Sequence, residues 1–65
     1  MIFIAKCKID NSATIEYHKS VVKAPDEKEA KKILKNYYAP GYDDVCYILN
    51  IKQYELRDGD ILEVS

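Results

Sequence analysis

Residues 2–9 are rich in β-branched and apolar side chains and have one face without polar residues, which predicts a strand that buries this face. One face of this first stretch is wholly apolar and is formed by Phe3, Ala5, Cys7 and Ile9. Turn-forming residues at 10–13 separate it from a second extended stretch at 14–23, so the pattern predicts an antiparallel hairpin. In the second stretch the apolar residues change face between Tyr17 and Val22, and we therefore expect a bulge near 19–21.

Residues 26–38 change to the spacing of an amphipathic helix. Asp26 and Glu29 match a capping box, in which the aspartate accepts a hydrogen bond from a free backbone N–H of the first turn. Four residues at helical spacing form the expected inner face: Ala30, Ile33, Leu34 and Tyr37. Pro40 cannot continue the hydrogen-bond ladder and Gly41 permits a left-handed turn, so we expect the helix to end just before them.

Residues 45–51 are largely apolar on both faces, which is typical of a central strand. Residues 57–60 read RDGD and predict a tight turn, after which residues 61–64 are expected to form a short last strand. We therefore predict a ββαββ order and an α+β fold, with one amphipathic helix packed on a three- to four-stranded sheet. No repeat or linker divides the chain, so residues 1–65 are expected to form one small domain.

Residues 55–64 read ELRDGDILEV and resemble the closing segment of β-grasp (ubiquitin-like) domains, notably the sulfur-carrier and TGS-type members. In those domains a leucine precedes an Asp-Gly-Asp turn and an alternating final strand, and the order of elements is similar. The resemblance implies a β-grasp fold for this chain. Sulfur carriers are activated at a C-terminal Gly-Gly, whereas this chain ends in Val64 and Ser65, so carrier or conjugation chemistry is not expected.

The size and charge of the chain limit the functions that it can have. It has 65 residues and a formal net charge of −1, from ten basic and eleven acidic side chains. A domain of this size buries one thin core and has little left to line a deep substrate cleft. The near-zero total argues against a dedicated nucleic-acid or membrane-surface protein, although residues 1–35 hold eight basic and five acidic side chains and residues 36–65 hold two and six.

No segment has the pattern of a membrane span or a secretion signal. The longest apolar run is at 1–5, whereas a span needs about 18 apolar residues and a signal peptide needs a basic head before its apolar part. We therefore expect a cytoplasmic protein. The abundant lysine, isoleucine and tyrosine have AT-rich codons, which together with the initiating methionine favours a complete small product of a phage or mobile element.

Few residues have the spacing that catalysis or metal binding needs. His18 is the only histidine, and Ser20 lies two residues on, but no acidic residue is placed to orient the histidine. Two acidic pairs occur without the spacing of a calcium loop: Asp43 with Asp44, and Asp58 with Asp60. Cys7 and Cys46 lie outside any zinc motif, and we interpret them as free thiols. We therefore expect no enzyme activity, no cofactor and no metal.

The most distinctive stretch is 36–44, in which three tyrosines, a Pro-Gly turn and two acidic residues lie within nine residues. Helical spacing places Tyr37 in the core, which leaves Tyr38 and Tyr42 as the expected exposed pair. Tyrosine supplies large contact area at low entropic cost, so we predict a non-catalytic protein-binding module, an adaptor or inhibitor whose partner has a basic surface. The predicted contact residues are Tyr38, Tyr42, Asp43 and Asp44. The alternative, that all three tyrosines only close the core, stays open.

Two other functions also stay open. A basic surface for RNA or DNA phosphates is formed by lysines of the helix: Lys28, Lys31, Lys32 and Lys35. Further lysines on the hairpin extend it: Lys6, Lys8, Lys19 and Lys23. The competing interpretation is a solvated helix face and edge strands that lysine protects from aggregation. A homodimeric structural protein is the third class, because so thin a core often gains from association.

Overall fold

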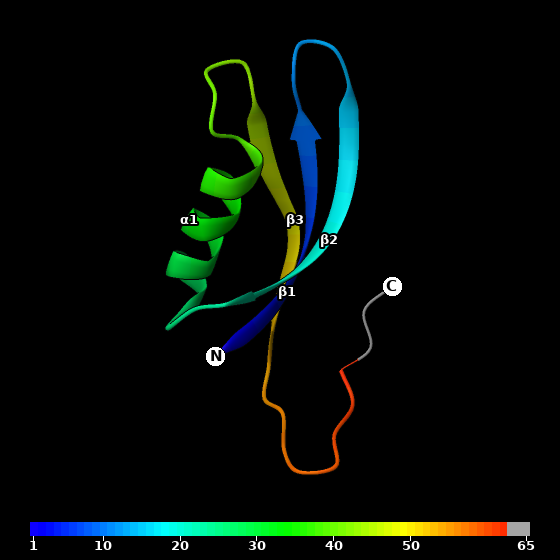
Figure 1. The fold of residues 1–65 in the computed structure, drawn as a ribbon, viewed down its shortest axis with the longest axis vertical. Helices are drawn as coiled ribbons and strands as arrows, with labels where there is room; N and C mark the ends of the chain where they lie inside the picture. The colour runs from blue at the N-terminus through cyan, green and yellow to red at the C-terminus, as the bar shows by residue number, and fades with distance from the viewer. Residues whose placement is uncertain (63–65) are drawn as a thin grey trace.

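The computed structural model describes residues 1–62 of the chain. Its elements follow in the order β1 (Ile2–Asp10), β2 (Ile15–Lys23), α1 (Glu27–Tyr38) and β3 (Val45–Tyr54). The three strands form one antiparallel sheet in the order β2-β1-β3, and α1 lies against one face of it (Figure 1). The predicted α+β fold, with one helix packed on a three-stranded sheet, is therefore confirmed.

The predicted ββαββ order is wrong, because the described chain has no fourth strand. Residues 61–62 are not extended in a sheet, and the rest of the expected strand, 63–64, lies outside the described residues. The turn before it is present: the backbone N–H of Asp60 donates to the carbonyl of Arg57 at 3.0 Å, and Gly59 has a φ of 90°, which favours glycine. This turn needs only local hydrogen bonds between residues 57 and 60. The β-grasp resemblance, which rests on the same segment, stays a prediction.

The hairpin of β1 and β2 forms as predicted. The Oδ1 atom of Asn11 accepts hydrogen bonds from the backbone N–H groups of Ala13 (2.9 Å) and Thr14 (2.8 Å), which closes the turn. The two strands pair without a register shift along their whole length, so the expected bulge near 19–21 is wrong. Apolar residues change face in β2 because both faces of this strand carry them, not because the backbone is irregular.

The central strand is β1, and the prediction of a central third strand is also wrong, since β3 lies at an edge. The pairing of β1 with β3 shifts between Lys6 and Cys7, which leaves Leu49 without a partner in β1. This bulge lets Ile48 before it and Ile51 after it both pack on the core. The apolar residues on both faces of β3 therefore reflect a bulge and an exposed face rather than burial on both sides.

The helix begins and ends where predicted, although Gly41 does not take the left-handed conformation expected there. The Oδ1 atom of Asp26 accepts from the backbone N–H of Glu29 at 2.8 Å, and the N–H of Ala39 donates to the carbonyl of Lys35 at 2.9 Å. Within residues 1–62 no helix has the length and the apolar content that a membrane span needs.

The face that α1 turns to the sheet differs from the predicted one. Ala30 and Leu34 are buried as expected, but Tyr37 is 76% exposed, and Tyr38 packs against the core instead. Residues 30, 34 and 38 are each four positions apart and line the sheet side together. The helix is therefore rotated from the orientation that the apolar spacing predicts, and the placement of Tyr37 in the core is wrong.

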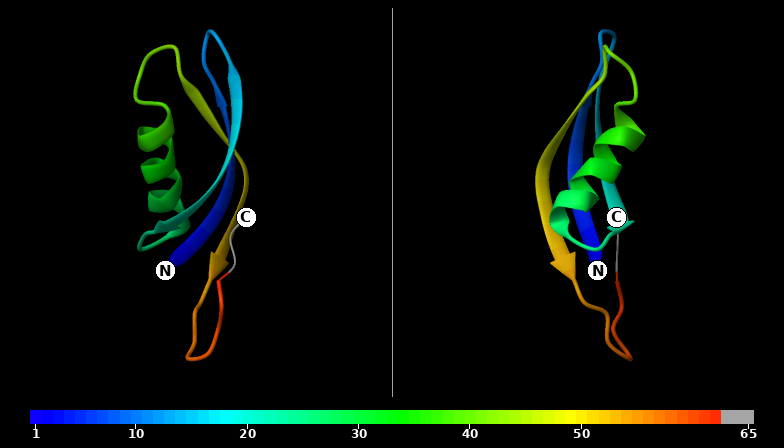
Figure 2. Two further views of the ribbon diagram at one scale, coloured as in Figure 1. Left: turned by 45° about the vertical axis from the view of Figure 1, so that its right-hand side comes forward. Right: turned by 90° about the vertical axis from the view of Figure 1, so that its left-hand side faces the viewer.

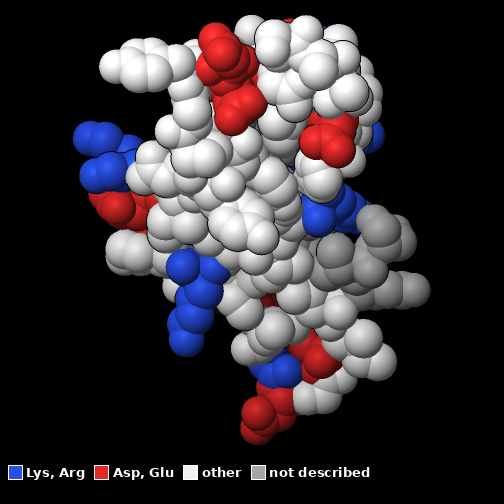
Figure 3. All heavy atoms as spheres, turned by 45° about the horizontal axis from the view of Figure 1, so that its top comes forward, with Lys and Arg blue, Asp and Glu red and all other residues white. Residues whose placement is uncertain are grey.

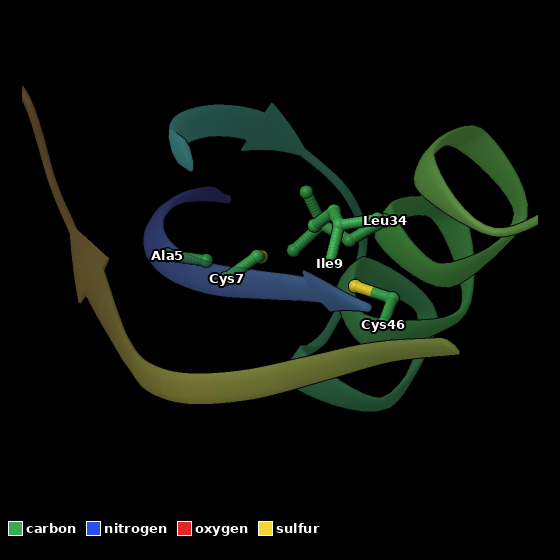
Figure 4. Close-up of a cluster of buried hydrophobic side chains, with 5 residues drawn as sticks. All are labelled: Ala5, Cys7, Ile9, Leu34 and Cys46. Atoms are coloured by element: carbon green, nitrogen blue, oxygen red, sulfur yellow. The ribbon is translucent and has the colours of Figure 1, made fainter. Parts of the chain in front are cut away.

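The core lies between α1 and the face of the sheet that it covers. One cluster of buried residues, shown in Figure 4, contains Ala5, Cys7, Ile9, Leu34 and Cys46. A second cluster contains Phe3, Ala24 and Ala30. Val22 and Ile51 pack against both clusters and join them. All of these residues are apolar or cysteine, so the covered face of the sheet is committed to stability.

Candidate functional site

The second face of the sheet is not covered by any other element of the described chain. In the left view of Figure 2, α1 lies on one side of the sheet only. Alternation along the paired strands places five lysines on the uncovered side: Lys6, Lys8, Lys19, Lys23 and Lys52. It places three tyrosines there as well: Tyr17, Tyr47 and Tyr54. We call the surface formed by these eight residues and Asn50 the open face.

The register of the three strands sets lysines and tyrosines side by side on the open face. Tyr17 and Tyr47 flank Lys8 in one row across the sheet. The Nζ atom of Lys8 lies 5.8 Å from the ring centroid of Tyr47, and Nζ of Lys52 lies 5.5 Å from that of Tyr54. Each pair forms a cation–π contact, which is weak at an exposed site. The contacts place an ammonium group next to an aromatic ring.

In the described part of the chain no lysine of the open face forms an ion pair, although Asp10 lies on the same side of the sheet, two positions from Lys8. Within residues 1–62 the ion pairs are Lys31 with Glu27 (3.5 Å) and His18 with Glu16 (3.9 Å), and neither involves this surface. In addition, Lys6 and Lys19 are directly opposite each other in the register, and like charges in that position destabilise a sheet. The open face is therefore a concentrated positive surface on a chain whose total charge is close to zero.

A hollow of about 600 Å³ lies in the open face. Ile4 and Ala5 of the central strand line it, together with Lys6, Lys19, Lys52, Tyr17 and Tyr54. Asn50, in the same row as Lys6 and Lys19, also lines it and is exposed. The hollow thus combines ammonium groups, phenol rings and one neutral amide, which suits an anionic and aromatic ligand.

The predicted protein-binding residues are not brought together as one exposed group. Tyr42 is fully exposed, with a relative exposure of 108%, and Asp43 is exposed beside it. Asp44 is only half-buried, and an added Cβ at Gly41 would lie 3.1 Å from its Oδ2 atom, so glycine leaves room for this carboxylate. Figure 3 brings this end of the molecule forward and shows acidic side chains among uncharged ones.

Tyr38, the fourth predicted contact residue, is held in place by its neighbours. Its ring stacks on that of His18, with centroids 5.0 Å apart and planes 27° apart, and it meets Tyr37 edge-on at 4.9 Å. Its hydroxyl is hydrogen-bonded to that of Ser20. The expectation of an exposed Tyr38 is therefore wrong, because the rotated helix directs this side chain onto β2; Tyr37 takes the exposed position.

The lysines of the helix form a weaker basic surface than the open face does. Lys31 is paired with Glu27, and two acidic residues, Glu27 and Glu29, lie in the first turn. Lys28, Lys32 and Lys35 remain as an exposed stripe. These lysines make no cation–π contact of the kind that Lys8 and Lys52 make.

The cysteines and the histidine do not form a reactive centre. Cys7 and Cys46 are free thiols buried in one core cluster, and burial first, then Cys46, raises the pKa of the Cys7 thiol from 9.0 to about 11. A thiol with so high a pKa is a poor nucleophile at neutral pH. His18 and Ser20 both contact Tyr38, as described above. Within residues 1–62 no group of three or more histidine, cysteine or acidic side chains could hold a metal ion.

The β3 residues of the open face were not recognised as site residues in the sequence. Lys52 and Tyr54 alternate with inward-facing positions, which is a signal that the sequence contains. Tyr47 does not fit the same alternation, because the bulge at Leu49 adds one residue between them. Comparisons with known protein families, with characterised proteins and with solved structures found no match. Function is therefore inferred from the surface chemistry of the chain itself.

Proposed function

We propose that this domain is a non-catalytic binding module that holds nucleic acid on the open face of its sheet. The observation that carries the proposal is that five lysines and three tyrosines share one uncovered face, with no carboxylate within ion-pair distance in the described chain. Lysine supplies point charges for phosphate, and the charge of the polymer is what dominates the affinity of nucleic-acid binding. We thus assign nucleic-acid binding to the lysines of the sheet rather than to those of the helix, because tyrosine rings lie beside the lysines of the sheet.

The net charge of −1 does not oppose this proposal. One acidic residue, Asp10, lies on the same side of the sheet at the end of β1, whereas the others lie in β2 (Glu16), at the start of α1, in the loop before β3 and in the segment after it. Charges more than about 8 Å apart are largely screened from each other at physiological ionic strength. A phosphate at the open face therefore meets a local field that is more positive than the total charge indicates.

The test compares two variants that remove the same number of charges. The open-face variant carries Lys6→Gln, Lys19→Gln and Lys52→Gln, and the helix variant carries Lys28→Gln, Lys32→Gln and Lys35→Gln. Binding to a fluorescein-labelled 12-nucleotide single strand is followed by anisotropy between 50 and 200 mM salt. We expect the open-face variant to lose about tenfold or more in affinity and to bind with a shallower salt dependence, by about 2 in the log–log slope.

The helix variant is expected to stay close to the unchanged protein. Equal losses in the two variants would show attraction by overall charge rather than by a site. No binding of the unchanged protein at 50 mM salt would remove nucleic-acid binding altogether.

A second surface supports the protein-binding function predicted from the sequence, and it does not overlap the open face. Tyr42 is fully exposed and stands beside Asp43 in the loop that links α1 to β3. An acidic surface with a free aromatic ring is suited to a partner with a basic surface. Tyr42→Ala with Asp43→Asn should abolish capture of such a partner, with Tyr37→Ala as the exposed-tyrosine control. If the partner still binds the Tyr42→Ala, Asp43→Asn variant but no longer binds the Tyr37→Ala variant, the contact lies on the helix and not on the loop.

A further inference from the structure

The three tyrosines of the open face are partly exposed. Tyr17 is 63% exposed, Tyr47 48% and Tyr54 36%, so part of each side chain is accessible to a ligand. A nucleic-acid base stacks on such a ring only when its own face is free. In a duplex both faces of each base are covered by the neighbouring base pairs. The tyrosine rings can therefore stack on the bases of an unpaired strand but not on those of a duplex.

The breadth of the open face also disfavours a duplex. The major groove of DNA is about 12 Å wide and accepts a helix or a two-stranded ribbon, and the minor groove is about 6 Å wide. Three strands spaced about 4.8 Å apart, with their side chains, form a platform that is broader than a two-stranded ribbon. A flexible single strand, in contrast, lies across a platform of this kind with its bases directed toward it.

The spacing of the rings defines a short site. Tyr17 and Tyr47 lie on the two outer strands of one row, about 10 Å apart, with the Lys8 ammonium between them. Tyr54 lies seven residues beyond Tyr47 along the same strand, roughly 20 Å away. An ammonium beside each stacking position places phosphate contacts next to base contacts. The area matches about four nucleotides, at the lower end of the site sizes of small β-rich modules.

Asn50 adds a group that can contact a base edge. It lies in the hollow between the ring row and Tyr54, in the same row as Lys6 and Lys19. Its amide is both a donor and an acceptor, so it can pair with the hydrogen-bonding edge of an unstacked base. In a duplex that edge is already paired with the complementary base, and only an unpaired strand offers it.

We infer that the ligand of the open face is single-stranded nucleic acid, held by stacking of bases on Tyr17, Tyr47 and Tyr54 and by phosphate contacts of the lysines between them. This inference rests on the nucleic-acid-binding function proposed above and narrows it to one class of ligand.

The experiment separates stacking from charge. A ring-loss variant carries Tyr17→Leu and Tyr47→Leu, and a matched control carries Tyr37→Leu and Tyr42→Leu, two exposed tyrosines away from the open face. Anisotropy is measured with a labelled 12-nucleotide thymidine oligomer and with a 12-base-pair duplex of mixed sequence. The chain has no tryptophan, so its tyrosine fluorescence can be followed directly in the same titrations.

We expect the thymidine oligomer to bind at least tenfold more tightly than the duplex and to quench tyrosine fluorescence. The ring-loss variant should lose about twentyfold in single-strand affinity, at about fivefold for each ring, with an unchanged salt slope because no charge is removed. The control should keep full affinity. Tyr17→Phe with Tyr47→Phe retains the rings and should restore binding, which excludes misfolding as the cause of the loss.

Equal affinity for the duplex, or full affinity in the ring-loss variant, overturns the single-strand inference. If the open-face lysine substitutions still weaken binding in that case, nucleic-acid binding stands and only the ligand class is wrong. If neither oligomer binds at 50 mM salt, both proposals fail together.

Discussion

The two faces of the sheet are formed by the same three strands but differ in burial and in the side chains that they carry. On the side covered by α1, the inward positions of β1 are apolar and buried, and Leu34 and Cys46 close the cluster around them. On the open face the alternate positions carry exposed or partly exposed side chains, among them five lysines and three tyrosines. One helix can cover only one face, so the same period-two pattern yields a core on one side and an exposed surface with lysines and tyrosines on the other.

The difference teaches which residues carry stability in so small a domain. Folding free energies of about 0.05–0.15 kcal/mol per residue leave little margin, so most of the stability must come from the single covered face. The open face contributes less by burial, and the like charges of Lys6 and Lys19 oppose each other there, which lowers stability.

The largest expected effect on stability comes from replacing isoleucine on the covered face, compared with replacing isoleucine on the open face. Ile9 is 4% exposed on the covered face, whereas Ile15 is 54% exposed on the other. Ile9→Ala should lower the free energy of unfolding by about 2–5 kcal/mol through a cavity in the core, and Ile15→Ala by about 1 kcal/mol or less. Urea unfolding followed by circular dichroism measures both. Similar losses in the two variants would mean that the open face is also buried in solution, as in a dimer.

A second prediction concerns the Cys7 thiol on the covered face. Burial raises its pKa from 9.0 to about 11, so the folded protein keeps the proton that the unfolded chain loses between these values. Stability that is complete below pH 9 should therefore fall as the pH rises toward 11, by at most about 1.4 kcal/mol per pH unit. Urea midpoints at pH 8, 9 and 10 measure this. The pH dependence of Cys7→Ala should be shallower, and parallel curves for the two proteins would contradict the prediction.

The smallest effect is expected on the open face, where Lys6 and Lys19 oppose each other. Lys19→Glu replaces a repulsive cross-strand pair by an attractive one and should raise stability by about 0.2–1 kcal/mol, less at high salt. The same change should weaken single-strand binding, because it removes one phosphate contact and adds a repelling charge. A gain in stability without a loss of binding would show that this row lies outside the ligand site.

Local interactions explain the parts of the fold that could be predicted. The Asn11 turn, the Asp26 cap and the helix end at Ala39 each depend on hydrogen bonds between residues a few positions apart. The same holds for the turn closed between Arg57 and Asp60.

The candidate site was predicted only in part. Lys6, Lys8, Lys19 and Lys23 were singled out as a basic surface on the hairpin, but β3 was expected at the centre of the sheet. The lysine and tyrosines of β3 are therefore not part of the basic surface that the sequence predicts. The tyrosine loop was recognised, yet Tyr37 and Tyr38 exchanged roles because apolar spacing alone does not fix the rotation of a helix that carries aromatic residues on two adjacent positions.

The sequence by itself determined where the first two strands, the helix and the turns lie, since each depends on propensity, spacing and capping over a few residues. Only the tertiary structure decided that β1 is central, that the bulge at Leu49 keeps two segments of β3 on the core, and that Tyr38 rather than Tyr37 packs on the sheet. The physical reason is that alternation marks two faces on every strand, whereas the path of the chain after β2 determines which of them the helix covers. The side left uncovered is the side on which the lysines and tyrosines meet.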